Sequence, residues 1–391
     1  MTNCVLSPDG LWRSSGHTEM AAIRPSPHSQ TQFPSTCFLI TPIPSRLPTK
    51  MTRQSSDQLP WDPQATAFPT RAELPKITGA PDQAAWVWGE DDNVGRLNLL
   101  TPQRVATAAK QIQTGEVVPL NLPLNVPEQP AFQRQCFHHE IKTVVPNLIF
   151  DDTYNLNTQS GTQWDGFRHF AHLSSATFYN HTKATDVVGP DANSKCSIEH
   201  WAERGIAGRG VLLDYCDYAK RNGIKFDPYD TCKITFNELV DCGKEQGIDI
   251  RPEAQGGDVQ IGDILFIRSG WVEDYHRRSP EERNKLGTRT HDDIKFGGVA
   301  QEPAILDWLH DSYFAAVAGD APTFEAWPPT GGYYLHEYIL SLWGMPLGEM
   351  LQLEKLAEKC RERKKWTFFF TSSPANCPNG VSTHVNGLAI L

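Results

Sequence analysis

The chain lacks the features that mark a nucleic-acid-binding or membrane-spanning protein. It has no run of basic residues, and its net charge of −10 disfavours a nucleic-acid partner. No stretch approaches the roughly 20 consecutive apolar residues that a membrane-spanning helix needs. The apolar run near the N-terminus, Cys37–Ile40, is also too short for the core of a signal peptide. These absences leave a small molecule as the expected partner.

Paired cysteines are also missing. Nine cysteines are scattered along the chain without CxxC spacing, which disfavours a cysteine-based zinc site or a dithiol redox centre. An odd and dispersed set is typical of reduced thiols in a reducing compartment. The cysteine pattern therefore predicts a cytoplasmic protein.

Two common catalytic motifs are absent. The chain has no GxSxG sequence, which disfavours a serine hydrolase of the α/β-hydrolase type. It also has no glycine-rich phosphate loop, because the glycines at Gly205–Gly210 precede a predicted strand instead of following one. The catalytic groups must therefore be sought among other residues.

The first 50 residues differ in composition from the rest. Pro, Ser and Thr occupy 20 of these 50 positions without a helical or strand period, so this segment buries too little apolar surface to fold. We expect a disordered extension over residues 1–60 and ordered structure from about Ile77. Met51 offers an alternative start, in which case the extension would be an artefact of the gene model.

The rest of the chain alternates between buried strands and amphipathic helices. Short apolar runs predict strands at 209–215, 262–271, 313–322, 366–374 and 385–391. Apolar residues at helical spacing predict helices at 101–115, 235–247, 302–312 and 354–365. Thr101 and Thr235 are placed to cap the first two helices. This mixture predicts a single α/β domain.

The segment Thr158–Leu173, TQSGTQWDGFRHFAHL, concentrates polar side chains that can carry chemistry. Asp165 and His169 are four residues apart, and on a helical turn they would face the same way. A carboxylate beside an imidazole either orients a general base or joins it as a metal ligand. Read alone, such a pair is more often part of a polar loop, and His172 fits a packed turn.

A second candidate set lies nearer the C-terminus. His336 and Glu349 are 13 residues apart, with a glycine and a proline between them, so they lie on separate elements that could converge. Read alone, this set is typical of ordinary amphipathic helices. Arg268 and Asp320 each follow a buried strand, where α/β folds build their sites. Asp320 is either a functional residue or the cap of the next turn.

Together these blocks resemble the cyclase family of metal-dependent hydrolases, which includes bacterial kynurenine formamidase and isatin hydrolase. The family motif is His-x-Gly-Thr-His-x-Asp-x-Pro-x-His. Residues 159–169 read QSGTQWDGFRH, in which Gly, Thr, Asp and the last His match in register. The similarity extends over roughly residues 86–391, and this form of the motif is similar to that of a fungal subgroup.

The resemblance implies an α/β fold, a metal and roles for residues. The fold is a swivelling β/β/α domain, here a single catalytic domain over residues 77–391, in a homodimer or larger homo-oligomer. A divalent ion, manganese or zinc, would be bound by Asp165, His336 and Glu349, and His169 would transfer the proton. Trp164 and Tyr179 are expected to form an aromatic wall for a planar substrate.

Two positions depart from the family motif. Gln159 and Gln163 stand where relatives carry histidine ligands. A glutamine offers a neutral carbonyl oxygen, which is a poorer donor for zinc than imidazole but suits harder ions. Gln159 is therefore either a weak metal ligand or the sign of a site without metal, in which Gln163 would donate to a substrate oxygen.

Three hypotheses follow from these observations. In the first, the protein is a hydrolase that uses a metal-activated water on a carbon–nitrogen or ester-like bond of a small aromatic or polyketide-type molecule. In the second, it is a metal-free cyclase or lyase of secondary metabolism, with His169 and Asp165 as the acid/base pair. In the third, it is a binding protein that has lost catalysis.

Overall fold

The computed structural model describes residues 52–391. The disorder predicted for residues 1–60 therefore lies outside the described residues up to residue 51, whereas residues 52–60 are part of the described structure and hydrogen-bond to it through Thr52 and Gln54. Ordered structure begins well before Ile77, which corrects the predicted boundary. Trp61 and Phe68 are buried in a small apolar cluster, and the Phe68 ring stacks on Tyr313 with centroids 4.7 Å apart. This aromatic contact joins residues 52–76 to the folded unit.

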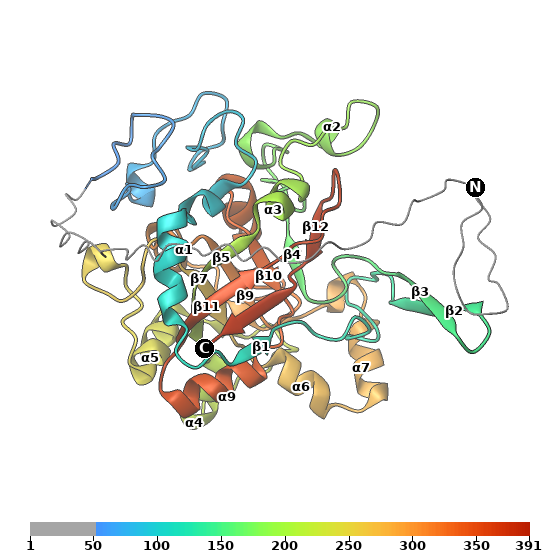
Figure 1. Cartoon of the computed structure of the whole chain (residues 1–391). Helices are drawn as coiled ribbons and strands as arrows, with labels where there is room; N and C mark the ends of the chain where they lie inside the picture. Colours follow the sequence, from blue (N-terminus) through green and yellow to red (C-terminus); the bar gives the residue numbers. More distant parts are fainter. Residues whose placement is uncertain (1–51) are drawn as a thin grey trace, which may run out of the picture. The chain divides into compact units, whose positions relative to one another are not determined.

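A mixed sheet of nine strands forms the centre of the described part (Figure 1). Its order is β1-β13-β11-β5-β7-β9-β10-β4-β12, and β5, β7, β9 and β10 run parallel while the outer pairs are antiparallel. The bounds are β1 Val117–Pro119, β4 Gln163–Asp165, β5 Ile206–Leu213, β7 Ile264–Ile267, β9 Ala316–Gly319, β10 Leu347–Glu349, β11 Thr367–Ser372, β12 Ser382–His384 and β13 Gly387–Ile390.

Helices pack around this sheet, and the predicted α/β class is confirmed. The α-helices of the described part are α1 Pro102–Ala108, α2 Ala184–Val187, α3 Glu199–Arg204, α4 Tyr215–Arg221, α5 Phe236–Gln246, α6 Trp271–Arg277, α7 Pro280–Gly287, α8 Pro303–Asp311 and α9 Glu354–Arg363. Short 3-10 segments lie at Arg71–Glu73, Gly95–Leu99, Ala109–Gln111, Tyr179–His181, Glu253–Gln255 and His291–Asp293, and a π-helix lies at Glu337–Leu342. None of the described helices combines the length and apolar character that a bilayer span requires.

The sequence patterns explain these elements. The strands β5, β7 and β9 are buried along nearly their whole length, as the continuous apolar runs predicted. The predicted caps are confirmed, because the side chains of Thr101 and Thr235 accept hydrogen bonds from the backbone three residues ahead. The first helix ends near Gln111, a few residues before Gly115.

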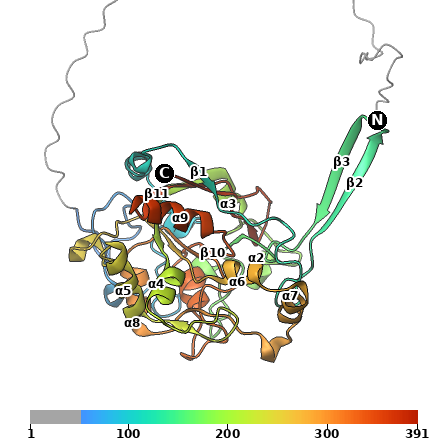
Figure 2. The ribbon, with the colours of Figure 1, turned by 90° about the horizontal axis from the view of Figure 1, so that it is seen from below.

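Two small sheets complete the described part. β6 (Lys233–Ile234) pairs with β8 (Gly298–Val299), and β2 (His138–Val145) pairs with β3 (Ile149–Asn155). The β2–β3 hairpin projects away from the body in both views (Figures 1 and 2).

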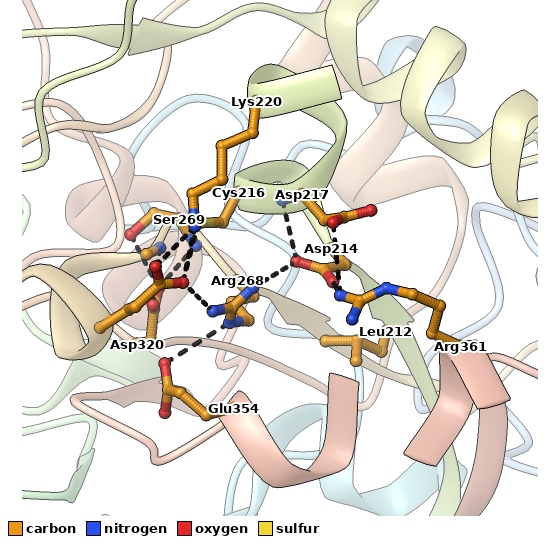
Figure 3. A network of polar contacts seen from close by, with 12 residues as sticks. Leu212, Asp214, Cys216, Asp217, Lys220, Arg268, Ser269, Asp320, Glu354 and Arg361 are labelled. Atoms are coloured by element: carbon orange, nitrogen blue, oxygen red, sulfur yellow. Dashed lines mark hydrogen bonds and ion pairs between the residues drawn. The ribbon is translucent and has the colours of Figure 1, made fainter. Parts of the chain in front are cut away.

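Charged side chains directly follow three parallel strands and belong to one network of polar contacts (Figure 3). Arg268, after β7, lies 2.8 Å from Asp214, which follows β5, and 2.6 Å from Glu273. Asp320, after β9, accepts hydrogen bonds from the backbone N–H groups of Ser269 and Gly270. Asp320 therefore holds the turn that follows β7, whereas the cap predicted for it was of the turn after Asp320 itself.

The Arg268 cluster leads to a stability prediction. Arg268→Met leaves the buried Asp214 with only one arginine partner, so we expect the free energy of unfolding to fall by about 3 kcal/mol. Chemical denaturation measures this change. The control is Arg251→Met, since the Arg251–Asp249 pair is exposed and contributes little. Equal effects of the two substitutions would contradict the structural role.

Candidate functional site

The strands β4 and β10 bring together the polar side chains that the sequence singled out. They pair antiparallel, with Glu349 directly opposite Gln163. Because side chains alternate along a strand, Gln163 and Asp165 share the face that carries Glu349. All three side chains are buried. The register of one strand pair therefore places two carboxylates and an amide in one small volume.

His336 reaches the same volume from another element. It precedes the π-helix Glu337–Leu342, and π-helical turns are frequent at functional sites. Glu325 accepts hydrogen bonds from the backbone N–H of His336 and contacts its Nδ1 at 2.6 Å. This contact leaves Nε2 to face the carboxylates, 3.3 Å from Glu349 and 3.7 Å from Asp165. The predicted convergence of His336 and Glu349 is confirmed.

Two glutamine amides cross-link the cluster. Gln159 Nε2 donates to Asp165 Oδ1 at 2.6 Å, and Gln163 Nε2 donates to Gln159 Oε1 at 2.8 Å and to Glu349 at 3.0 Å. Two buried oxygens, Asp165 Oδ2 and Gln163 Oε1, have no hydrogen-bond partner in the structure. A buried acceptor without a partner is costly, so these atoms indicate a missing cation or donor.

The donor set fits a divalent cation. One ligand atom each from Asp165, His336 and Glu349 lie within 4.8 Å of one another. Two carboxylates and an imidazole suit zinc or manganese, and three protein ligands leave positions open for water or substrate. Glu325 orients the imidazole as the outer partner that metal-bound histidines usually have. Gln159 lies beside this group but presents its amide nitrogen to Asp165, so it is not a ligand in this arrangement.

His169 lies next to the cluster, and a tight turn after β4 places it there. Asp165 ends β4, and His169 follows in a turn closed by a hydrogen bond to the carbonyl of Gly166, so the two residues do not share one helical turn. The imidazole Nε2 nevertheless lies 3.9 Å from Asp165 Oδ2, and the side chain stays 22% exposed. A molecule entering the site can therefore reach His169.

Burial and neighbouring charges together set the pKa values of this cluster. Burial lowers the pKa of His169, although the Asp165 carboxylate opposes it. Burial and the neighbouring Asp165 raise the pKa of Glu349 to about 7. Burial alone would lower the pKa of His336, but its contacts with Glu325 and Glu349 raise it well above the ordinary value. In the absence of a cation, His336 supplies positive charge to the carboxylates.

The predicted aromatic wall is wrong. Trp164 points to the opposite face of β4, is fully buried, and donates from its indole nitrogen to Ser372 at 3.0 Å. Gly348 on β10 makes room for it, because a side chain there would collide with the indole ring. Tyr179 is also fully buried and donates to Asp92 at 2.8 Å. Strand alternation explains the error for Trp164, since the neighbours of a site residue face away from it.

Three residues near the site were not predicted. Glu325 lies in the segment that follows β9, and its isolated charge among apolar and small residues was the available signal. The ring of Phe170 lies 5.3 Å from that of His336. Arg134 donates to the backbone carbonyl of Gln159 at 2.9 Å, and its charge acts on both Asp165 and Glu349. Nothing in the local sequence marks Arg134.

A cavity of about 420 Å³ lies along the segment that carries Gln159. Its walls include Ser160, Gly161 and Thr162 from this segment and His384 from β12. His384 is directly opposite Gln163 in the β12–β4 register, so the two side chains share one face of the sheet. His384 is therefore a further polar side chain beside the cluster.

Comparisons with known proteins place the chain in a family. The family described as "Putative cyclase" matches residues 118–326, more than half of the chain. A crystal structure of a novel cyclase shares 26% identity and a TM-score of 0.67, covering 79% of this chain and 99% of its own. Isatin hydrolase A from Ralstonia solanacearum (16% identity, 70% of this chain and 91% of its own, TM-score 0.47) and from Labrenzia aggregata (15%, 70%, 93%, 0.45) are more distant. No curated protein matches the chain. As its motif predicted, the chain belongs to the cyclase family.

Proposed function

We propose that this protein is a metal-dependent hydrolase that opens an amide, lactam or ester-like bond in a small cyclic or aryl-linked molecule. The observation that carries the proposal is the convergence of Asp165, His336 and Glu349 in a buried site. The unpaired Oδ2 of Asp165 supports it, because a cation would satisfy that atom. Membership of the cyclase family supports an enzyme of the hydrolase or cyclase kind.

The ion would be zinc or manganese and would supply Lewis acidity toward a carbonyl oxygen and an activated water. The chain's own residues supply the rest of the chemistry. His169 accepts a proton at Nε2, the nitrogen that faces Asp165, and returns it to the leaving group. Arg134 places a cation beside the site, where it stabilises negative charge that develops on the substrate.

The amides of Gln159 and Gln163 stand where relatives carry histidines, and they position the carboxylates of the site. As arranged, they donate to Asp165 and Glu349 and hold the two carboxylates in position. A half-turn of either amide exchanges its oxygen and nitrogen and would offer a carbonyl oxygen instead. Oxygen donors favour manganese over zinc, so we propose manganese as the better-suited ion.

A metal-free acid/base cyclase or lyase is the second candidate. One observation favours it: the Glu349 carboxylate already has neighbours that balance its charge. Glu349 receives a hydrogen bond from Gln163 and lies 3.3 Å from the His336 imidazole, whose pKa is raised. In this version His169 and Asp165 act alone on a substrate that is already reactive.

Bound metal and chelation distinguish these two candidates. We expect the purified protein, after growth or dialysis with Mn²⁺ or Zn²⁺, to carry near-stoichiometric metal by mass spectrometry. Hydrolysis within a panel of aryl formamides, lactams and aryl esters should stop after chelation and return when the ion is added back. Protein that stays metal-free under every supplementation, and retains its activity with chelator present, would establish the metal-free candidate instead.

A further inference from the structure

Arg134 brings a positive charge to the candidate site without an ion-pair partner. Within residues 52–391, its half-buried guanidinium forms one hydrogen bond, from Nη1 to the backbone carbonyl of Gln159 at 2.9 Å, and no ion pair. The edge of the guanidinium formed by Nε and Nη2 is the one that binds a carboxylate through two parallel N–H groups, and it is left for solvent or a ligand. The charge acts on both Asp165 and Glu349. An unpaired guanidinium beside a site indicates an anionic ligand.

The backbone just before Arg134 is strained. Phe132 and Gln133 both have positive φ angles, of 58° and 55°. Residues other than glycine rarely adopt this left-handed region, and residues held in it cluster at ligand clamps and active sites. Across this bend, the Arg134 guanidinium lies over the Phe132 ring, 4.9 Å from its centroid. The strained bend and the ring contact together fix the place of the guanidinium.

Four partly exposed aromatic rings connect Arg134 with the metal-binding group. We call them the aromatic arc, which consists of Phe132, Trp327, Tyr334 and Phe170. Neighbouring rings along the arc have centroids 5.4 Å apart. The last ring, that of Phe170, lies 5.3 Å from the ring of His336. Aromatic side chains pack well against a planar ring of a ligand, so the arc offers such a ring a surface beside the site.

The contacts of Arg134 and of the aromatic arc form a closed circuit that includes the metal-binding group. Arg134 is bonded to Gln159, whose Nε2 donates to Asp165 Oδ1 at 2.6 Å. Asp165 Oδ2 lies 3.7 Å from His336, where the arc ends. His169 lies 3.9 Å from the same oxygen of Asp165. A ring that packs on the arc therefore lies between the guanidinium and the groups that carry the chemistry.

We propose that Arg134 anchors an acidic group of the substrate, so that the protein selects small ring-bearing molecules that carry a carboxylate near the bond to be opened. This inference rests on the proposed function, which assigns that bond. The free edge of the guanidinium donates two N–H groups to the carboxylate, while the ring of the substrate packs on the aromatic arc. One guanidinium carries one charge, which one carboxylate balances. The anchored substrate then presents its amide or ester-like bond to the metal-binding group and His169.

Binding of simple probes to the metal-free full chain tests the anchor without depending on hydrolysis. Benzoate, benzamide and acetate are titrated by calorimetry, and the ion is left out because a carboxylate could bind it directly. We expect benzoate to bind best, since benzamide lacks the charge and acetate lacks the ring. Arg134→Met should weaken benzoate binding by about 10-fold or more, because a charge-assisted hydrogen bond is lost, and should leave benzamide unchanged. Arg134→Lys, which keeps the charge, should retain part of the benzoate affinity.

Arg283→Met is the matched control for the binding experiment. Arg283 also lies over an aromatic ring, that of Tyr275 at 4.6 Å, and donates to the Tyr275 carbonyl at 2.9 Å, but it belongs to α7 and has no contact with the arc. This variant should bind all three probes as wild type does. Benzoate that binds wild type no more tightly than benzamide, or that binds Arg134→Met as tightly as wild type, would overturn the anchor. The first comparison uses wild type alone, so it decides even where a variant fails to fold.

Steady-state kinetics separates the anchor from the proposed function. The two substrates are 2-formamidobenzoate, which is acidic, and formanilide, which is the same aryl formamide without the carboxylate. We expect kcat/KM to favour the acid, and Arg134→Met should reduce this preference by about 10-fold or more, mainly through KM. An equal loss for both substrates would leave Arg134 only the stabilisation of developing charge and would overturn the anchor. If neither is hydrolysed while benzoate binding still depends on Arg134, the anchor stands and the proposed function fails.

Discussion

Asp165→Asn is expected to remove the metal and the activity together. The substitution keeps the shape of the side chain but removes the charge from the unpaired Oδ2, which faces the imidazoles of His169 and His336. Loss of an outer-shell partner alone costs about 10–100-fold in metal affinity, so loss of a ligand should exceed about 100-fold. Hydrolysis should fall in proportion to the bound metal.

Folding stability separates this functional role from a structural one. Asp165 is fully buried, and its charge is costly to bury without a cation. The metal-free Asn variant should therefore unfold at the same denaturant concentration as metal-free wild type, or a higher one. Asp249→Asn, at an exposed ion pair, serves as the control and should change neither metal content nor activity. An Asp165→Asn protein that binds metal as tightly as wild type would refute the assigned ligand set.

His169→Gln is expected to lower kcat by about 10²–10⁴-fold while the metal stays bound. His169 contacts the cluster through Asp165 at 3.9 Å and is partly exposed, so it is placed for proton transfer and lies outside the group of three ligands. Glutamine fills similar space but cannot accept the proton. Steady-state kinetics on a hydrolysed substrate, with metal content measured on the same samples, gives the comparison.

His172→Gln is the matched control for this experiment. His172 lies three residues further along, and its ring contacts the Ser175 hydroxyl at 2.8 Å, in agreement with the structural role expected for it. The control should retain wild-type kcat. Loss of metal from the His169 variant would make His169 a ligand, and an unchanged kcat would exclude it as the proton-transfer residue.

Many of the strands and helices could be predicted from the local pattern of apolar and capping residues in the sequence. The apolar runs of β5, β7 and β9 and the capped starts of α1 and α5 depend on residues close in sequence, so they were predicted where the structure has them. The order of the strands was not predicted, because neighbours such as β13 and β1 are far apart in the chain. The aromatic contacts of residues 52–76 with Tyr313 were missed for the same reason.

The features of the site also separate into those that the sequence predicted and those that only the structure shows. A family motif and the spacing of polar residues were enough to single out Asp165, His169, His336 and Glu349. Their convergence, the unpaired Asp165 oxygen and the support from Glu325 are visible only in three dimensions. Trp164 shows most clearly what the sequence alone did not predict. It lies between two site residues in the sequence, yet strand alternation turns its side chain into the core.

The sequence by itself determined the family, the α/β class and the chemical groups available to the site. Tertiary structure alone decided which of those groups meet and that the Gln159 and Gln163 amides hold the two carboxylates. The physical reason is that composition and periodicity report the preference of each local segment for a helix or a strand. Hydrogen bonds and charge balance in a buried site depend instead on strand register and on residues more than a hundred positions apart.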